Sequence, residues 1–120
     1  MADLPVIIDA DTGRIKKDTD ITPIDDSDSP YTVGESEDLI LVDSSGGAVT
    51  VILPAASASN IKGHYTIKDA AGSAATHNIT INPNGVQTLD GASSVTLAVN
   101  YNCITFMSNG VDGYVILTLF

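Results

Sequence analysis

From Asp38 to the C-terminus, apolar and polar residues alternate with a period of two, in short runs interrupted by Gly, Pro and Asn. This alternation, together with many Val, Ile and Thr residues, predicts β-strands and excludes helices, whose apolar period is about 3.6 residues. Eight runs have the length of strands. They cover 38–43, 48–53, 64–68, 78–82, 86–89, 95–99, 104–107 and 114–120.

Turn-forming residues separate these runs. Ser44-Ser-Gly-Gly47 predicts a tight hairpin between the first two strands, because Gly supplies the positive φ values that such turns need. Asn82-Pro-Asn-Gly85, Asp90-Gly91 and Asn109-Gly110 predict further turns. Strands at this spacing predict an all-β fold, an antiparallel β-sandwich or jelly-roll-like module, over residues 39–120.

Residues 1–38 differ from the rest in charge. They hold eleven acidic and three basic residues, a net charge of −8, whereas residues 39–120 have a net charge of −2. The segment from Thr19 to Glu37 is rich in Asp, Ser, Thr and Pro and has too few apolar residues to fold alone. We therefore predict that residues 1–38 form an extended acidic arm and linker outside the β domain.

One apolar run stands out in this arm. Leu4-Pro-Val-Ile-Ile-Asp9 predicts one short strand. An apolar strand separated from its domain by an acidic linker is typical of an attachment segment, in which Leu4, Val6, Ile7 and Ile8 would make the contacts. The alternative is that Val6–Ile8 pairs onto an edge of the same domain.

Composition sets limits on stability and partners. The 120 residues include two Phe and no Trp, so we predict a thin aliphatic core that association between copies would supplement. The net charge of −10, with no basic stripe, argues against direct binding to nucleic acid or to anionic membranes. No export signal or membrane-spanning run is visible, so we expect synthesis and assembly in the cytoplasm.

Few residues suggest chemistry. Asp11-Thr-Gly13 matches the catalytic loop of aspartic proteases, but the bulky cation Arg14 follows where a small residue is needed. The acids of Asp9–Gly13 and of Asp25–Asp28 suggest calcium loops, yet the twelfth residue from Asp9 is Asp20 and not the bidentate Glu that such loops use. We interpret both acidic segments as solvated turns.

The remaining candidates are two histidines and one cysteine. His64 and His77 lack the spacing of metal ligands, and nothing in the sequence relates either of them to Cys103. Cys103, the single cysteine, is expected to be a small buried apolar residue. We therefore predict no catalytic, cofactor-binding or metal-binding residue and no enzyme activity.

Residues 43–116 contain segments that occur together in one family. They are Asp43-Ser-Ser-Gly-Gly-Ala-Val-Thr-Val-Ile-Leu-Pro54, Tyr65-Thr-Ile-Lys-Asp69, Asn78-Ile-Thr-Ile-Asn-Pro-Asn-Gly85, Leu89-Asp-Gly91, Ile104-Thr-Phe-Met-Ser-Asn-Gly110 and Tyr114-Val-Ile116. In order and spacing the chain resembles a β module of bacteriophage virion proteins, found in tail fibres, head fibres and capsid-decorating proteins. The family usually has Trp in the last hairpin, where Gly113 stands here.

The resemblance implies a trimeric β module on a phage particle, with no catalytic residues. The shortness of the chain favours a capsid-decorating protein of the cement or head-fibre type, located in the virion, with the major capsid protein or another virion protein as its partner. The alternative is a tail-fibre or adhesion module that binds a receptor or a host-surface glycan. That alternative requires exposed aromatic side chains, and we expect at least half of the four tyrosines, Tyr31, Tyr65, Tyr101 and Tyr114, to be buried.

Overall fold

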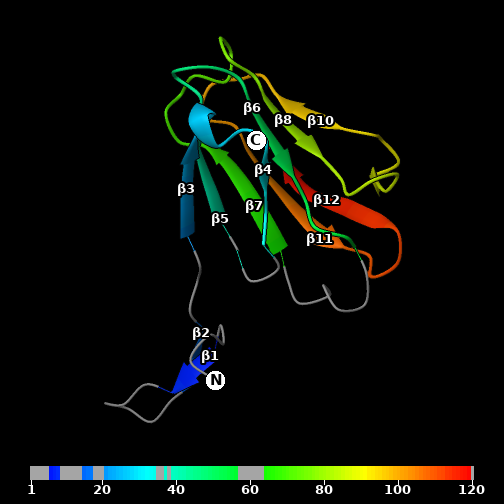
Figure 1. Ribbon diagram of the computed structural model, residues 1–120. Helices are drawn as coiled ribbons and strands as arrows, with labels where there is room; N and C mark the ends of the chain where they lie inside the picture. The colour runs from blue at the N-terminus through cyan, green and yellow to red at the C-terminus, as the bar shows by residue number, and fades with distance from the viewer. Residues whose placement is uncertain are drawn as a thin grey trace.

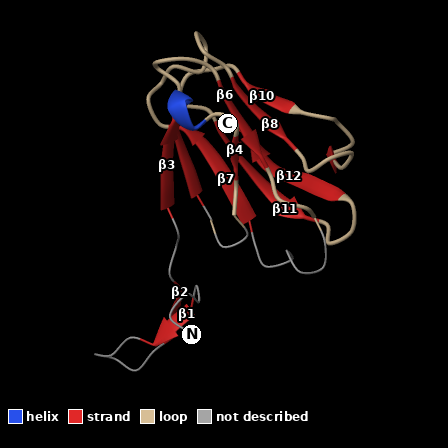
Figure 2. Ribbon diagram, viewed as in Figure 1, coloured by secondary structure: helices blue, strands red, loops and turns tan. Residues whose placement is uncertain are grey.

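The computed structural model describes residues 6–8, 15–17, 21–34, 37, 39–56 and 64–119, with side chains described from Ile21 onward. Within these residues the protein is nearly all β, with strands in a two-stranded, a four-stranded and a six-stranded sheet. Helical structure in the described part is confined to one short 3-10 turn, η1 (Asp26–Asp28), drawn in blue in Figure 2. The all-β prediction is therefore confirmed.

The two larger sheets contain all eight strands predicted from Asp38 onward. The six-stranded sheet has the order β3 (Ile21–Asp25), β5 (Leu39–Asp43), β7 (His64–Asp69), β11 (Cys103–Ser108), β12 (Gly113–Leu119) and β9 (Thr88–Leu89). The four-stranded sheet has the order β10 (Val95–Leu97), β8 (Ile79–Asn82), β6 (Val49–Ile52) and β4 (Tyr31–Thr32). The predicted and observed strand ends agree to within two residues, apart from Phe120, which lies outside the described residues.

Three successive strand pairs cross from the six-stranded to the four-stranded sheet: β3 to β4, β5 to β6, and β7 to β8 (Figure 1). Equivalent strands of successive pairs lie parallel and in register, with Ile40 opposite Ile67 in one sheet and Val51 opposite Ile81 in the other. We call each crossing turn an arch. The sheets are completed by three antiparallel pairs, β7 with β11, β11 with β12, and β8 with β10, and by the parallel pair of β12 with β9. Their pairing is therefore mixed and not wholly antiparallel as predicted.

The hairpin predicted at Ser44–Gly47 is wrong, because β5 and β6 lie in different sheets. The glycines of this turn also have a different role from the one expected, since neither is among the positive-φ residues of the described chain. A Cβ atom on Gly46 would lie 2.7 Å from Oδ1 of Asp26, in the turn of the preceding arch. Gly46 therefore allows two arches to stack closely.

The linker interpretation of residues 19–37 is also wrong for its described part. Strand β3 pairs with β5, and β4 pairs with β6, so this segment adds one strand to each sheet. Ile24 and Val33 are buried in the common core. The segment is too acidic to fold alone, but it folds here because β5 and β6 provide its hydrogen-bonding partners.

Glu37 holds this first arch closed. Its Oε2 atom accepts hydrogen bonds from Thr22 Oγ1 at 2.7 Å and from Tyr31 Oη at 2.6 Å, and its Oε1 atom accepts one from the Gly34 backbone N–H at 2.7 Å. Thr22 lies in β3 and Tyr31 in β4, so a single carboxylate links the two strands.

The inward side chains of both sheets belong to one hydrophobic cluster. Its largest fully buried members are Tyr65, Tyr114 and Phe106. The Tyr114 ring meets those of Tyr65 and Phe106 edge to face, with ring centroids 6.0 Å and 6.4 Å apart. The composition had suggested a wholly aliphatic core. The core instead contains an aromatic cluster, because the few aromatic residues that are present converge.

Candidate functional site

The predicted attachment residues lie in the N-terminal part of the chain. Val6, Ile7 and Ile8 form β1 (Val6–Ile8), which pairs antiparallel with β2 (Ile15–Lys17) in a separate two-stranded sheet. The strand prediction is confirmed, and the alternative pairing with an edge of the larger sheets is not observed in the described residues. Leu4 lies outside the described residues, and attachment through these four residues stays a prediction.

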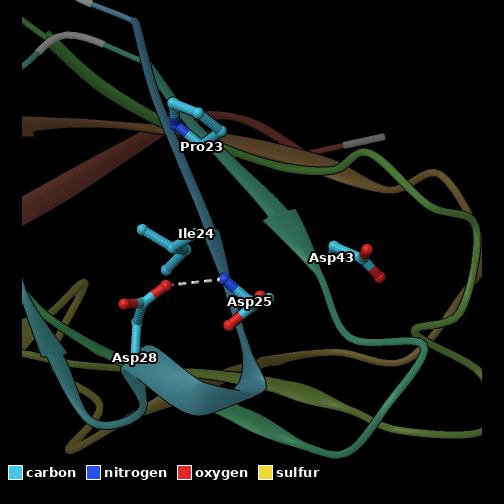
Figure 3. A pocket seen from close by; sticks show the side chains of 5 residues that line it. All are labelled: Pro23, Ile24, Asp25, Asp28 and Asp43. Carbon is cyan, nitrogen blue, oxygen red and sulfur yellow. Dashed lines mark hydrogen bonds between the residues drawn. The ribbon is translucent and has the colours of Figure 1, made fainter.

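The motif Asp11-Thr-Gly13, and Asp9 beside it, also lie outside the described residues. The second acidic segment, Asp25–Asp28, is described and sits at the first arch. Figure 3 shows Asp25 and Asp28 on one side of an open depression and Asp43, from the neighbouring strand, on the other. Pro23 and Ile24 line it as well.

The carboxylates around this depression act as turn caps. Asp25 accepts hydrogen bonds from the Ser27 backbone N–H at 2.9 Å and from its hydroxyl, while Asp28 accepts one from the Asp25 N–H at 2.9 Å. Asp43 does the same for Ser45, at 2.9 Å from the N–H and 2.6 Å from the hydroxyl. The depression is therefore the outer side of two stacked turns.

Hydrogen bonding stabilises the ionised form of two of these acids. The hydroxyl and then the N–H of Ser27 lower the pKa of Asp25 from its ordinary value, and the same two groups of Ser45 lower the pKa of Asp43. Among the residues with described side chains, however, no three His, Cys, Asp or Glu side chains converge as a metal site would require.

Asp69, at the end of β7, is a buried carboxylate with several hydrogen-bond partners. Its carboxylate accepts hydrogen bonds from four backbone N–H groups. The donors are Tyr101 at 2.8 Å, Gly72 and Ala74 at 3.0 Å, and Ser73 at 3.3 Å. Three donors follow β7 and the fourth precedes β11, so one carboxylate joins two loops that are distant in sequence.

Two effects oppose each other at Asp69. Burial raises the pKa of its carboxyl group, but the N–H groups of Tyr101, Ala74, Ser73 and Gly72 together outweigh burial, and the pKa lies below 3.8. The group is therefore a buried anion whose charge is neutralised by backbone dipoles. Its role is structural, because all of these contacts are internal to the fold.

Tyr101 packs over the same corner. Its φ angle is +65°, an unusual value for a residue other than Gly, and its side chain is 60% exposed. The ring leaves no room for a side chain on Gly72, where a Cβ atom would lie 2.3 Å from the ring. The ammonium group of Lys68 lies 5.6 Å from the centre of the ring and donates a hydrogen bond to the Tyr101 carbonyl.

The two histidines and the cysteine are not brought together. His64 is exposed on β7, whereas His77 is half-buried and places Nδ1 2.8 Å from the carbonyl oxygen of Ser44. The Ser44 hydroxyl is buried without a hydrogen-bond partner in the described part of the chain. Cys103 is half-buried on the outward side of β11, so it is less buried than the small buried apolar residue that was expected.

Sequence reasoning missed Asp69, although a signal for it was present. Three described strands, β3, β5 and β7, each end in an aspartate, at Asp25, Asp43 and Asp69. This repeat of a strand that ends in Asp marks the start of each arch. A search for internal repeats would have suggested stacked arches.

Comparison with known proteins finds no family that matches this chain and no curated protein to which it is similar. Among the described residues, no helix has the length and apolar character needed to span a bilayer.

Proposed function

We propose that this chain is a non-enzymatic structural protein of a bacteriophage virion. In this proposal it is a capsid-decorating homotrimer of the cement or head-fibre type, held on the particle by its N-terminal segment. The resemblance of residues 43–116 to phage β modules motivates the proposal. The observation that carries it is the use of the described carboxylates: Asp25, Asp43, Asp69 and Glu37 all hold turns closed. Such a design suits a rigid scaffold.

The finer architecture belongs to the same proposal. We regard the two larger sheets as the layers of a β-sandwich, because one core cluster contains side chains from both. Trimer formation is supported by large apolar side chains that an isolated chain leaves exposed, among them Val99, Leu117 and Leu119. Burial between copies would supply stability that a small domain lacks.

Two measurements test this function. Light scattering on the purified, untagged chain is expected to give the mass of three protomers, and a monomer at all concentrations would contradict the proposal. Deleting residues 1–17 is expected to leave a folded trimer that no longer co-sediments with purified capsids of the phage that encodes it, whereas the full chain does. Loss of folding in the deletion variant would contradict the attachment role of this segment.

One observation favours the alternative, a receptor- or glycan-binding module. Tyr65 and Tyr114 are buried, as expected for half of the tyrosines, but Tyr101 presents a largely exposed ring, which is the kind of surface on which sugars stack. A glycan array tests this function. Binding by the full chain that is lost in Tyr101→Asn, a residue that tolerates positive φ, would support adhesion, whereas an array without hits would dismiss it.

A further inference from the structure

The stack of three arches ends at two strands that no other described strand covers. β3 is the last strand at one end of the six-stranded sheet, and β4 is the last at one end of the four-stranded sheet. A parallel, in-register stack can be extended by a further strand or arch, because its outer edge carries backbone N–H and C=O groups. β3 is the longest edge strand of these sheets: it has five residues, whereas β4 and β9 have two and β10 has three.

The backbone donors on the outer edge of β3 are blocked. Successive residues of a strand turn their N–H groups to opposite sides, so every second residue of β3 faces away from β5. The Asp25 N–H faces away, and it donates to Oδ2 of Asp28 at 2.9 Å (Figure 3). Pro23, two residues earlier, faces the same way and has no N–H. Of the three outward residues of β3, only Ile21 is left to offer an N–H to an incoming strand.

The same arrangement recurs on β4. The Val33 N–H donates to a carbonyl oxygen of β6 at 2.9 Å, so Val33 faces β6 and the residues on either side of it face away. The N–H of Gly34 donates to Oε1 of Glu37 at 2.7 Å. Pro30, directly before β4, is also an outward residue in this alternation and has no N–H. Thr32 lies between these two blocked positions.

An edge without donors is a poor template for another strand. A strand that paired with it would turn its own carbonyl groups toward positions that cannot donate, and these groups would lose water without gaining a partner. Prolines and charged side chains at sheet edges are known means of preventing such pairing. Here each edge combines a proline with a carboxylate that binds a backbone N–H: Pro23 with Asp28, and Pro30 with Glu37.

We infer that the first arch is a cap, which prevents a strand of another copy or of another protein from adding to this end of the stack. The cap explains why the segment from residue 19 to residue 37 is rich in proline and acidic residues although it forms strands. The inference does not depend on the number of copies in the proposed virion component, because it concerns only which edge is closed to strand pairing.

The double variant Pro23→Val, Asp28→Ala tests the cap. It restores an N–H at position 23 and frees that of Asp25, and both changed side chains are exposed. Glu37 stays unchanged, because its carboxylate also joins β3 to β4. In sedimentation velocity we expect this variant to form assemblies whose mean mass rises with protein concentration to at least about twice that of the unchanged chain.

The control is the double variant Thr96→Val, Asp112→Asn. It makes the same change in net charge and adds the same valine side chain to an exposed position of another edge strand, β10, but creates no backbone donor. We expect it to sediment like the unchanged chain at every concentration. Circular dichroism and a cooperative melt verify that both double variants fold.

Two results in sedimentation would overturn the cap. One is a folded Pro23→Val, Asp28→Ala variant that sediments like the unchanged chain, and the other is equal growth in the control, since charge or apolarity would then be the cause. If the variant does not fold, amide hydrogen exchange in the unchanged chain decides. Exchange of the Asp25 and Gly34 N–H groups at least about tenfold slower than in an unstructured peptide supports the cap, and a smaller reduction overturns it.

Discussion

Replacing Asp69 by Ala is the sharpest perturbation of this fold, because it removes an acceptor shared by four backbone N–H groups. The Ala74 N–H is in a buried contact, and the other three are partly buried. A buried donor left unpaired costs about 1–3 kcal/mol, and the partly buried donors, which water can reach, cost less each. We expect the free energy of unfolding to fall by roughly 3–5 kcal/mol.

Thermal unfolding followed by circular dichroism measures this loss. At roughly 4 °C per kcal/mol for a domain of this size, the expected fall in Tm is about 12–20 °C. Asp69→Asn keeps one acceptor oxygen and should lie between the Ala variant and the unchanged protein. The control Asp112→Asn removes an equal charge from an exposed turn and should change stability by less than about 0.5 kcal/mol.

The same carboxylate predicts how stability depends on pH. The pKa of Asp69 in the folded state lies below 3.8, so its contribution is fully present above that pH and is lost as the pH falls through the folded-state value. The stability difference between the unchanged protein and Asp69→Asn should therefore be constant near neutral pH and shrink below about pH 4. A Tm of Asp69→Ala within 2–3 °C of the unchanged protein, or a difference that does not shrink in acid, would refute the reasoning.

Two further substitutions test the packing. Gly113→Ala places a Cβ atom 2.6 Å from the Thr88 carbonyl oxygen, so we expect the free energy of unfolding in urea to fall by about 1–3 kcal/mol. The control Gly34→Ala, whose Cβ atom would lie 3.6 Å from its nearest neighbour, should be tolerated. Equal losses in the two variants would contradict the packing argument. Tyr114→Phe removes the hydrogen bond from Oη to the Pro54 carbonyl at 2.7 Å and should cost about 1 kcal/mol in the same assay, while Tyr101→Phe, at an exposed ring, should cost almost nothing.

The candidate site was predicted less well than the fold. The strand at Val6–Ile8 was located from its run of apolar residues, and the acidic segment Asp25–Asp28 was correctly interpreted as a turn. Asp69 and the corner around Tyr101 were missed, because the Tyr101 and Asp69 contact joins residues 32 positions apart. No local pattern encodes which distant backbone N–H groups a carboxylate will meet.

The sequence by itself determined where the strands are, because alternation and β-branching act within a few neighbouring residues. It also determined that the turns fall at Gly, Asn and Asp. Only the tertiary structure decided which strands pair. The Ser44–Gly47 turn suits a hairpin and an arch equally. It becomes an arch because β5 lies between β3 and β7 in one sheet, while β6 lies between β4 and β8 in the other. The same holds for the described strands β3 and β4 of the acidic segment, since their partners, β5 and β6, lie later in the chain.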